Sequence, residues 1–140
     1  MRINERLLAY WQSLRTSASL PTEAQIDPEQ LKDIWDHCFL LHAEPEHRYT
    51  YTMLGHALVE AYGDDWTGKS VCEALLYPHP EPLFAAFKEV VATAEPHNEE
   101  NSFTNAAGLL IKYRSCLVPL ARHEGGPVAY ILGGMKWKAY

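Results

Sequence analysis

Three cysteines and seven histidines are the side chains of this chain that are best able to bind a metal ion. A zinc site would need closely spaced ligands such as Cys-x-x-Cys, His-x-His or His-Glu-x-x-His, and the sequence contains none of these. Most of the histidines fall in predicted turns or beside charged residues, where an imidazole is ordinarily solvated. His56, at the start of a predicted helix, and His79, between two prolines, are the exceptions. We therefore predict no metal site.

The motifs of the common enzyme classes are missing as well. The chain has no Gly-x-Ser-x-Gly nucleophile, no Gly-x-x-x-x-Gly-Lys phosphate loop and no Gly-x-Gly-x-x-Gly dinucleotide motif. Gly133 and Gly134 lie late in a predicted strand with no helix after them, so they do not form a phosphate-binding loop. The acidic residues lie in predicted turns and linkers, where carboxylates are solvated. We predict no catalytic residues and no enzymatic activity.

The composition indicates one acidic globular domain. Over 140 residues the formal net charge is −6, and the sequence shows no cluster of Lys and Arg, so nucleic acid is not expected as a direct partner. No apolar run is long enough to cross a bilayer, and the first residues lack the apolar region of a secretory leader. The odd number of widely spaced cysteines indicates reduced thiols. We expect a cytoplasmic protein without membrane insertion.

Residues 4–16 predict an amphipathic helix. Its apolar side chains recur at helical spacing at Leu7, Leu8, Tyr10, Trp11 and Leu14. Such a face has to be covered, either by the protein's own sheet or by the same helix of a second copy. A homodimer is therefore plausible.

The rest of the chain predicts an α+β domain around an antiparallel sheet. Gly63 should end one short helix as its C′ residue, Ser70 should cap the start of another, and 96–101 should form a polar linker. The expected helices cover 28–35, 57–62, a turn or two from 70, and 81 to about 95. The expected strands cover 38–42, 48–53, 102–105, 109–120 and 128–137.

The stretch from Arg48 to Val71 resembles the start of a PAS domain, where a hairpin is followed by short helices and a Thr-Gly punctuation. The pattern from Leu7 to Trp137 resembles small bacterial PAS proteins that carry an N-terminal helix and no attached catalytic domain. The resemblance implies a PAS-like five-stranded antiparallel sheet with helices on one face, preceded by the N-terminal amphipathic helix. Residues 1–35 would be an extension that packs on the sheet or at a dimer interface, and 36–140 would be the core.

The resemblance also implies a pocket between the concave face of the sheet and the helices that follow the second strand. Strand alternation should turn Lys112 and Arg114 to water. The residues between and beside them, Leu109, Ile111, Tyr113 and Leu117, should then point inward. Gly133 would either admit a close neighbour or leave room for a ligand. The same side chains could equally fill a solid core. The expected lining is Tyr51, Met53, Leu58, Tyr62, Trp66, Leu75, Phe84, Phe87, Ile111, Tyr113, Ile131, Gly133 and Met135.

Two cofactors of PAS proteins, flavin and haem, are not favoured by the sequence. The flavin-binding subfamily carries its reactive cysteine in a Gly-x-Asn-Cys-Arg-Phe-Leu-Gln stretch. The nearest match here, Gly68–Leu75, places Cys72 one residue late and lacks the Asn, Arg, Phe and Gln. A haem ligand needs a histidine on a helix that faces a cavity, and neither His56 nor His79 comes with supporting partners. The cofactor, if the protein has one, stays unknown.

The resemblance implies a stand-alone sensory or regulatory module that binds a small apolar or amphiphilic ligand or a partner protein, and signals by protein–protein contact. Two alternatives stay open: a small α+β cone-type enzyme (isomerase, dehydratase or cyclase) and a purely structural oligomerisation module. A buried ionisable group would favour the enzyme, and a pocket of apolar groups and hydroxyls would favour sensing. The expected contact surface is aromatic and apolar: Leu7, Tyr10, Trp11, Leu14, Tyr130 and Leu132.

Overall fold

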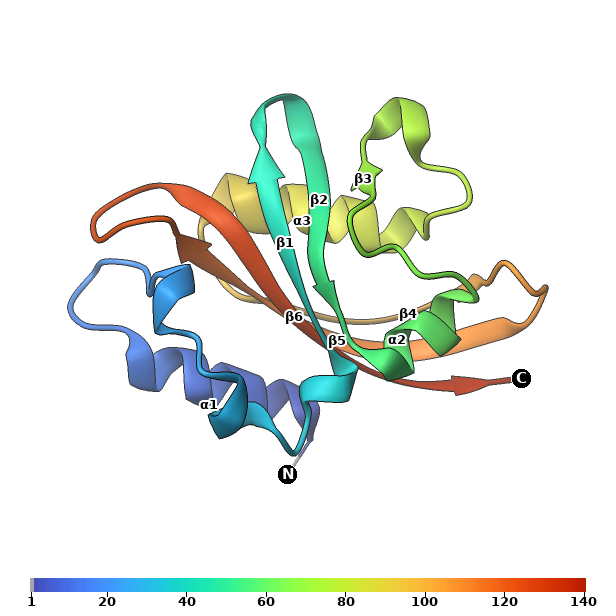
Figure 1. Cartoon of the computed structure of the whole chain (residues 1–140), viewed down its shortest axis with the longest axis horizontal. Helices are drawn as coiled ribbons and strands as arrows, with labels where there is room; N and C mark the ends of the chain where they lie inside the picture. The colour runs from blue at the N-terminus through green and yellow to red at the C-terminus, as the bar shows by residue number, and fades with distance from the viewer. Residues whose placement is uncertain (1) are drawn as a thin grey trace.

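The computed structural model describes residues 2–140, and its centre is a six-stranded antiparallel sheet in the order β3-β2-β1-β6-β5-β4 (Figure 1). The strands are β1 (Cys38–Glu44), β2 (Arg48–Leu54), β3 (Ser70–Val71), β4 (His97–Thr104), β5 (Leu110–Ala121) and β6 (Val128–Ala139). The helices are α1 (Ile3–Leu14), α2 (His56–Tyr62) and α3 (Glu81–Thr93). Short 3-10 turns complete the chain: η1 (Glu23–Gln25), η2 (Pro28–Leu31), η3 (Trp35–His37), η4 (Pro45–His47) and η5 (Glu73–Leu75). The predicted α+β architecture is confirmed, with a sixth, short strand added.

The sheet has an apolar core on each face. Along β5, Ile111 and Leu117 point to the inner face, whereas Cys116 and Val118 point to the outer face, as the period of two in a strand requires. Helices α2 and α3 cover the inner face and α1 covers part of the outer face; Figure 1 shows α3 behind β1 and β2, and α1 at the lower left. Each fully buried Leu or Ile stabilises the fold by about 1.5–3 kcal/mol.

Helix α1 packs on the sheet of its own chain. Ile3 and Leu7 are buried against β5 and β6. Hydrogen bonds fix the helix at both ends: the Asn4 side-chain N–H donates to the Ser115 carbonyl at 3.1 Å, and Trp11 Nε1 donates to the Pro119 carbonyl at 2.8 Å. The helix therefore belongs to the same compact unit as the sheet.

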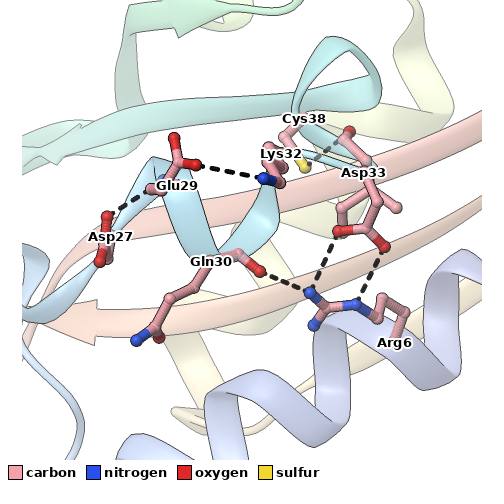
Figure 2. Close-up of polar contacts among 8 residues, drawn as sticks. Arg6, Asp27, Glu29, Gln30, Lys32, Asp33 and Cys38 are labelled. Carbon is pink, nitrogen blue, oxygen red and sulfur yellow. Dashed lines mark hydrogen bonds and ion pairs between the residues drawn. The ribbon is translucent and has the colours of Figure 1, made fainter.

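Arg6 ties α1 to the segment that leads into β1 (Figure 2). Its Nε and Nη2 donate to the two carboxylate oxygens of Asp33, both at 3.1 Å, and Nη2 also donates to the Gln30 carbonyl at 2.6 Å. These hydrogen bonds lower the pKa of the Asp33 carboxyl. Because Asp33 is exposed, the pair orients the segment more than it stabilises the fold.

The prediction of a second short helix from Ser70 is wrong, because Ser70–Val71 form strand β3 beside β2. The Thr-Gly turn is responsible: Gly68 adopts φ 79°, and its N–H donates to the Tyr51 carbonyl at 2.8 Å. That turn brings Val71 opposite Tyr49 in an antiparallel pair. Pairing with an existing strand then outweighs the local preference of Ser70 for a helix start.

The prediction of a polar linker at 96–101 is also wrong, because His97–Thr104 form β4 along the edge of the sheet. An edge strand pairs on one side only and tolerates polar residues, so its hydropathy gives little signal. The pairing is reinforced by Arg114, whose guanidinium binds the Glu100 carboxylate opposite it. The start of this strand was therefore invisible in the sequence pattern.

Two smaller predictions differ from the structure. The helix expected over 28–35 is a pair of 3-10 turns, η2 and η3, although Leu31 and Ile34 are buried as that helix would have placed them. Leu109 was expected to point inward, but it is 47% exposed. It lies in a turn before β5 whose N–H groups bond to the Asn105 side chain, so the alternation of the strand does not reach it.

Gly133 and Gly134 let both cores approach β6. A Cβ on Gly133 would lie 2.2 Å from Cζ of Phe39 on the inner face. A Cβ on Gly134 would lie 3.2 Å from side-chain atoms of Ile3 and Leu7 on the outer face. Of the two expectations for Gly133, the structure shows a close neighbour.

Candidate functional site

The inner core contains a histidine surrounded by aromatic rings, which we call the His79 cluster: Tyr51, Tyr62, Trp66, His79 and Phe87. The ring centroid of His79 lies 5.2 Å from that of Trp66, 5.8 Å from those of Tyr51 and Phe87, and 5.9 Å from that of Tyr62. These separations are typical of aromatic packing. The cluster joins β2, α2, the connections on either side of β3, and α3 into one layer.

Local sequence explains how each member of the cluster is placed. The alternation of β2 turns Tyr51 inward. Helix α2 ends at Tyr62 because Gly63 adopts the left-handed conformation (φ 76°), as predicted for a C′ glycine. The Asn105 side chain then holds the end of α2 by donating to the Ala61 carbonyl at 3.1 Å. His79 stands between two prolines, which keep it out of α3, so its ring can turn into the core.

Three polar side chains of the cluster form one hydrogen-bonded chain. The Tyr51 hydroxyl lies 2.8 Å from His79 Nε2 and 3.1 Å from the Tyr62 hydroxyl. Only 4% of His79 is exposed, and burial lowers its pKa to about 3, against a smaller opposing effect of the Pro80 backbone. The imidazole is therefore neutral at physiological pH. Its Nδ1 makes no hydrogen bond of normal geometry among residues 2–140, and the Pro80 backbone exerts only a weak hydrogen-bonding effect on the ring.

Other polar atoms of the inner face are unpaired too. Within the part of the chain that the structure describes, the buried hydroxyls of Tyr49 and Ser115 have no hydrogen-bond partner. Burial raises the pKa of Tyr49 to about 12, and raises the pKa of Tyr51 and Tyr62 as well. At neutral pH the site is thus uncharged, apolar in its walls, and supplied with free donors or acceptors. Such a site can orient a polar atom of a small molecule.

A second polar group lies at the β4 edge of the inner face. The Tyr113 hydroxyl donates to Glu99 at 2.9 Å, and His97 Nε2 lies 3.5 Å from the other oxygen of that carboxylate. Burial and the Glu99 charge raise the pKa of Tyr113. These groups satisfy one another, so they offer less to a ligand than the His79 cluster does.

Most of the residues predicted to line a pocket lie together in the inner core. They come from β2, α2, the loop after it, α3, β5 and β6, and each is buried. This set comprises Tyr51, Leu58, Tyr62, Trp66, Phe84, Phe87, Ile111, Tyr113, Ile131 and Met135.

Three of the predicted lining residues are placed differently. Met53 packs on the outer core, because the β1–β2 register shifts between Leu40 and Leu41 and reverses the facing of the residues beyond the shift. Leu75 lies in η5 and is 53% exposed. Gly133 is on the inner face, but the Phe39 ring occupies the space beside it.

From the sequence, His79 was raised only as a possible haem ligand, and Tyr49 was not among the residues predicted to line the pocket. The two flanking prolines were the available signal for His79, because they exclude it from a regular helix. For Tyr49 the signal was its parity with Tyr51 on the same strand. Neither signal shows that the two side chains are buried with unpaired polar atoms, which depends on packing by α3.

The residues predicted as an interaction surface are mostly covered by their own chain. Leu7, Tyr10, Trp11 and Leu132 are buried between α1 and the sheet. Leu14 is half-buried, and Tyr130 is half-buried beside His42, with ring centroids 5.0 Å apart. A role of these residues in partner contact stays a prediction.

Aromatic rings occupy the inner core, among them Phe39 and Phe87, whose ring centroids lie 5.9 Å apart. Cys72, the candidate reactive thiol, is half-buried at the start of η5 and lies outside the inner core. Within residues 2–140, no group of three or more His, Cys, Asp or Glu side chains is arranged to hold a metal ion.

Comparisons with known proteins agree with this fold. A family model described as a PAS domain matches residues 1–136. No curated protein matches the chain. In the span from residue 2 to residue 140, no helix is both long enough and apolar enough to cross a membrane.

Several solved structures have a similar fold, and three of them are domains of the LOV type. The light-state LOV structure of the blue-light photoreceptor Aureochrome1 gives a TM-score of 0.55 at 11% identity, over 77% of this chain and 85% of that one. The Rhodobacter sphaeroides LOV protein gives a TM-score of 0.54 at 14% identity, over 80% of this chain and 68% of that one. A LOV domain studied with a flavin analogue gives a TM-score of 0.54 at 11% identity, over 72% of this chain and 76% of that one. At these identities the likeness concerns the fold alone.

Proposed function

Since the chain belongs to the PAS domain family, we propose that it is a sensory module whose His79 cluster recognises a small amphiphilic ligand and which signals by protein–protein contact. The observation that carries the proposal is the buried Nδ1 of His79, which lacks a hydrogen bond of normal geometry inside an aromatic core. Leaving a buried polar atom without a partner costs about 1–3 kcal/mol. Departures of this kind from good packing are expected at functional sites.

The geometry suggests how a ligand would act. A polar group placed at Nδ1 of His79 would supply the missing hydrogen bond, while an apolar body would replace contacts among the surrounding rings. His79 belongs to the connection between β3 and α3, whose exposed residues include Leu75 and Tyr77. A ligand that binds better to one position of this connection shifts the protein toward that position. The change then reaches the surface of the domain.

Native mass spectrometry and an absorbance spectrum of freshly purified protein test the proposal first. We expect a retained small mass, or, in protein freed of it, amphiphilic compounds that raise the melting temperature. A His79→Leu variant should lose that response, and a His56→Gln variant, altered at an exposed histidine, should keep it. A bare mass together with no His79-dependent response contradicts ligand sensing.

The buried histidine also favours a second candidate, the small enzyme with one general base. A pKa of about 3 makes His79 a weak base at neutral pH, so this candidate is the less favoured. To test the enzyme hypothesis, the protein is incubated with a compound that it binds, and the molecular mass of the recovered compound is measured by mass spectrometry. A changed mass that requires His79 would support catalysis, and an unchanged mass supports sensing.

A further inference from the structure

The outer face of the sheet carries a groove lined by basic residues beyond the end of α1. Asn4, in the first turn of α1, donates to the Ser115 carbonyl, and the helix leaves the start of β5 and the end of β6 uncovered (Figure 1). An open groove of about 520 Å³ lies there. Its charged lining residues are Glu100, Lys112, Arg114, Lys136 and Lys138.

The cations of the groove lie opposite one another in the sheet. Lys112 on β5 pairs with Lys138 on β6, and Arg114 pairs with Lys136. Like charges directly opposite each other on one face destabilise a sheet. Within residues 2–140, the ion pair of Arg114 with Glu100 is the one salt bridge that these four cations make. The sequence showed no basic cluster because these residues come from strands more than twenty positions apart.

An aromatic ring completes the groove. Lys112 Nζ lies 4.9 Å from the centroid of the Tyr140 ring, and 65% of Tyr140 is exposed. Exposed tyrosines beside cations are common anchors of protein interfaces. The groove thus combines lysines that lack a salt-bridge partner among the described residues with an aromatic surface that can pack against the methylene groups of a glutamate side chain.

We propose that this groove docks an acidic segment of a partner protein, extended and with carboxylates at alternate positions. Side chains two residues apart on an extended segment are separated by about 7 Å, as are the two pairs of cations along β5 and β6. A short segment fits better than a long polyanion, because Glu5 and Glu100 lie beside Arg114 at one end of the groove, and the chain as a whole carries −6. Nucleic acid would meet that acidic surface.

This inference deepens the proposed function by naming an output surface, and its test does not depend on the buried site. The probe is a fluorescein-labelled peptide in which glutamate and threonine alternate, and its control carries glutamine in place of glutamate. Binding is measured by fluorescence anisotropy at low and at physiological salt. We expect the acidic peptide to bind at least tenfold more tightly than the control, and to weaken as salt rises.

Two variants locate the binding. Lys136→Glu combined with Lys138→Glu should weaken binding of the acidic peptide at least tenfold. The double variant should not have a lower melting temperature, because the substitutions remove the like-charge pairs across β5 and β6. Lys32→Glu combined with Arg48→Glu makes the same charge change at exposed sites outside the groove, and should alter binding less than twofold.

Three results would overturn the inference: no binding of the acidic peptide, equal binding by both double variants, or displacement of the peptide by an oligonucleotide or anionic vesicles at lower concentration than by unlabelled peptide. A His79→Leu variant should bind the peptide normally. Loss of peptide binding and loss of ligand sensing are therefore separate outcomes.

Discussion

His79 combines a polar ring with an apolar setting, and its burial has a defined effect on pH dependence. Its pKa falls from an ordinary value of 6.5 to about 3 in the folded protein. As the pH drops below 6.5, the unfolded chain takes up a proton at this residue that the folded chain refuses. The stability that neutral His79 confers is thus complete above pH 6.5 and is lost toward pH 3.

We expect the free energy of unfolding to fall by about 1.4 kcal/mol at this site between about pH 7.5 and 5.5. Urea unfolding at the two pH values measures the change. His79→Gln should flatten the dependence, and His123→Gln, at an exposed histidine, is the matched control. An equal pH dependence in all three proteins would show that His79 is not buried in its neutral form.

The Tyr51 hydroxyl serves two partners, and the Tyr62 hydroxyl serves one. Tyr51→Phe should leave both His79 Nε2 and the Tyr62 hydroxyl unpaired in the core, and should destabilise the protein by about 1–3 kcal/mol. Tyr62→Phe keeps the bond between Tyr51 and His79, so it should cost only about 0.5–1.5 kcal/mol. Urea unfolding of the two variants compares them, and the reverse order would contradict the arrangement.

At the scale of elements, β6 is the strand on which both cores depend. It pairs with β1 and β5, and its two glycines accept Phe39 from one face and α1 from the other. The inner contact is the tighter of the two, because a Cβ on Gly133 would overlap a ring that is itself buried. The outer neighbours of Gly134 are methyl ends of flexible side chains, which can move by a few tenths of an ångström.

Gly133→Ala should therefore destabilise the protein by about 1–3 kcal/mol or more, and Gly134→Ala by less. Adding Phe39→Leu to Gly133→Ala should recover part of the loss, because the smaller side chain makes room for the new methyl group. Thermal unfolding followed by circular dichroism measures all three variants. Failure of the second substitution to recover any stability would mean that another neighbour sets the cost.

At the scale of the whole molecule, one sheet supports an inner core with a polar centre and an outer core that is apolar. The outer core depends on α1, which covers the outer face together with Leu31 and Ile34 of the following segment. Arg6 and Trp11 add hydrogen bonds that orient the helix, but burial of its apolar stripe is the main stabilising term. The helix and the sheet should therefore behave as one cooperative unit.

Removal of residues 1–16 should expose that outer core and cause self-association or loss of solubility. Size-exclusion chromatography with light scattering, compared with the full chain at the same concentration, measures the change. Substituting Glu for the half-buried Leu14 is a milder control that leaves the helix in place, and it should keep the size of the full chain. A truncated protein of unchanged size and solubility would show that the outer core does not need α1.

The sequence predicted the elements whose residues alternate or recur strongly. The stripe of α1, the long strands β5 and β6, and the glycine that ends α2 were all recognisable from local chemistry. It failed at β3 and at the start of β4, because these segments are strands only by virtue of the neighbour they pair with. Local preference cannot report a partner that is distant in the sequence.

The same distinction explains the two sites. Alternation and helical spacing brought most of the inner lining together, but a register shift misplaced Met53, and the packing that isolates His79 left no pattern to read. The basic groove was missed for a simpler reason: Lys112 and Lys138 become neighbours only when β5 and β6 pair. Charge patterning along a sequence does not reveal charge patterning across a sheet.

The adjacent glycines of β6 also set how thick the sheet is. Elsewhere Cβ atoms separate the two cores, but at Gly133 and Gly134 only backbone lies between the Phe39 ring and the methyl groups of Ile3 and Leu7. Any displacement of that ring presses on the strand at its thinnest point. The opposite side of the same strand contacts Ile3 and Leu7 of α1, so a substitution that moves the Phe39 ring should also shift the outer helix.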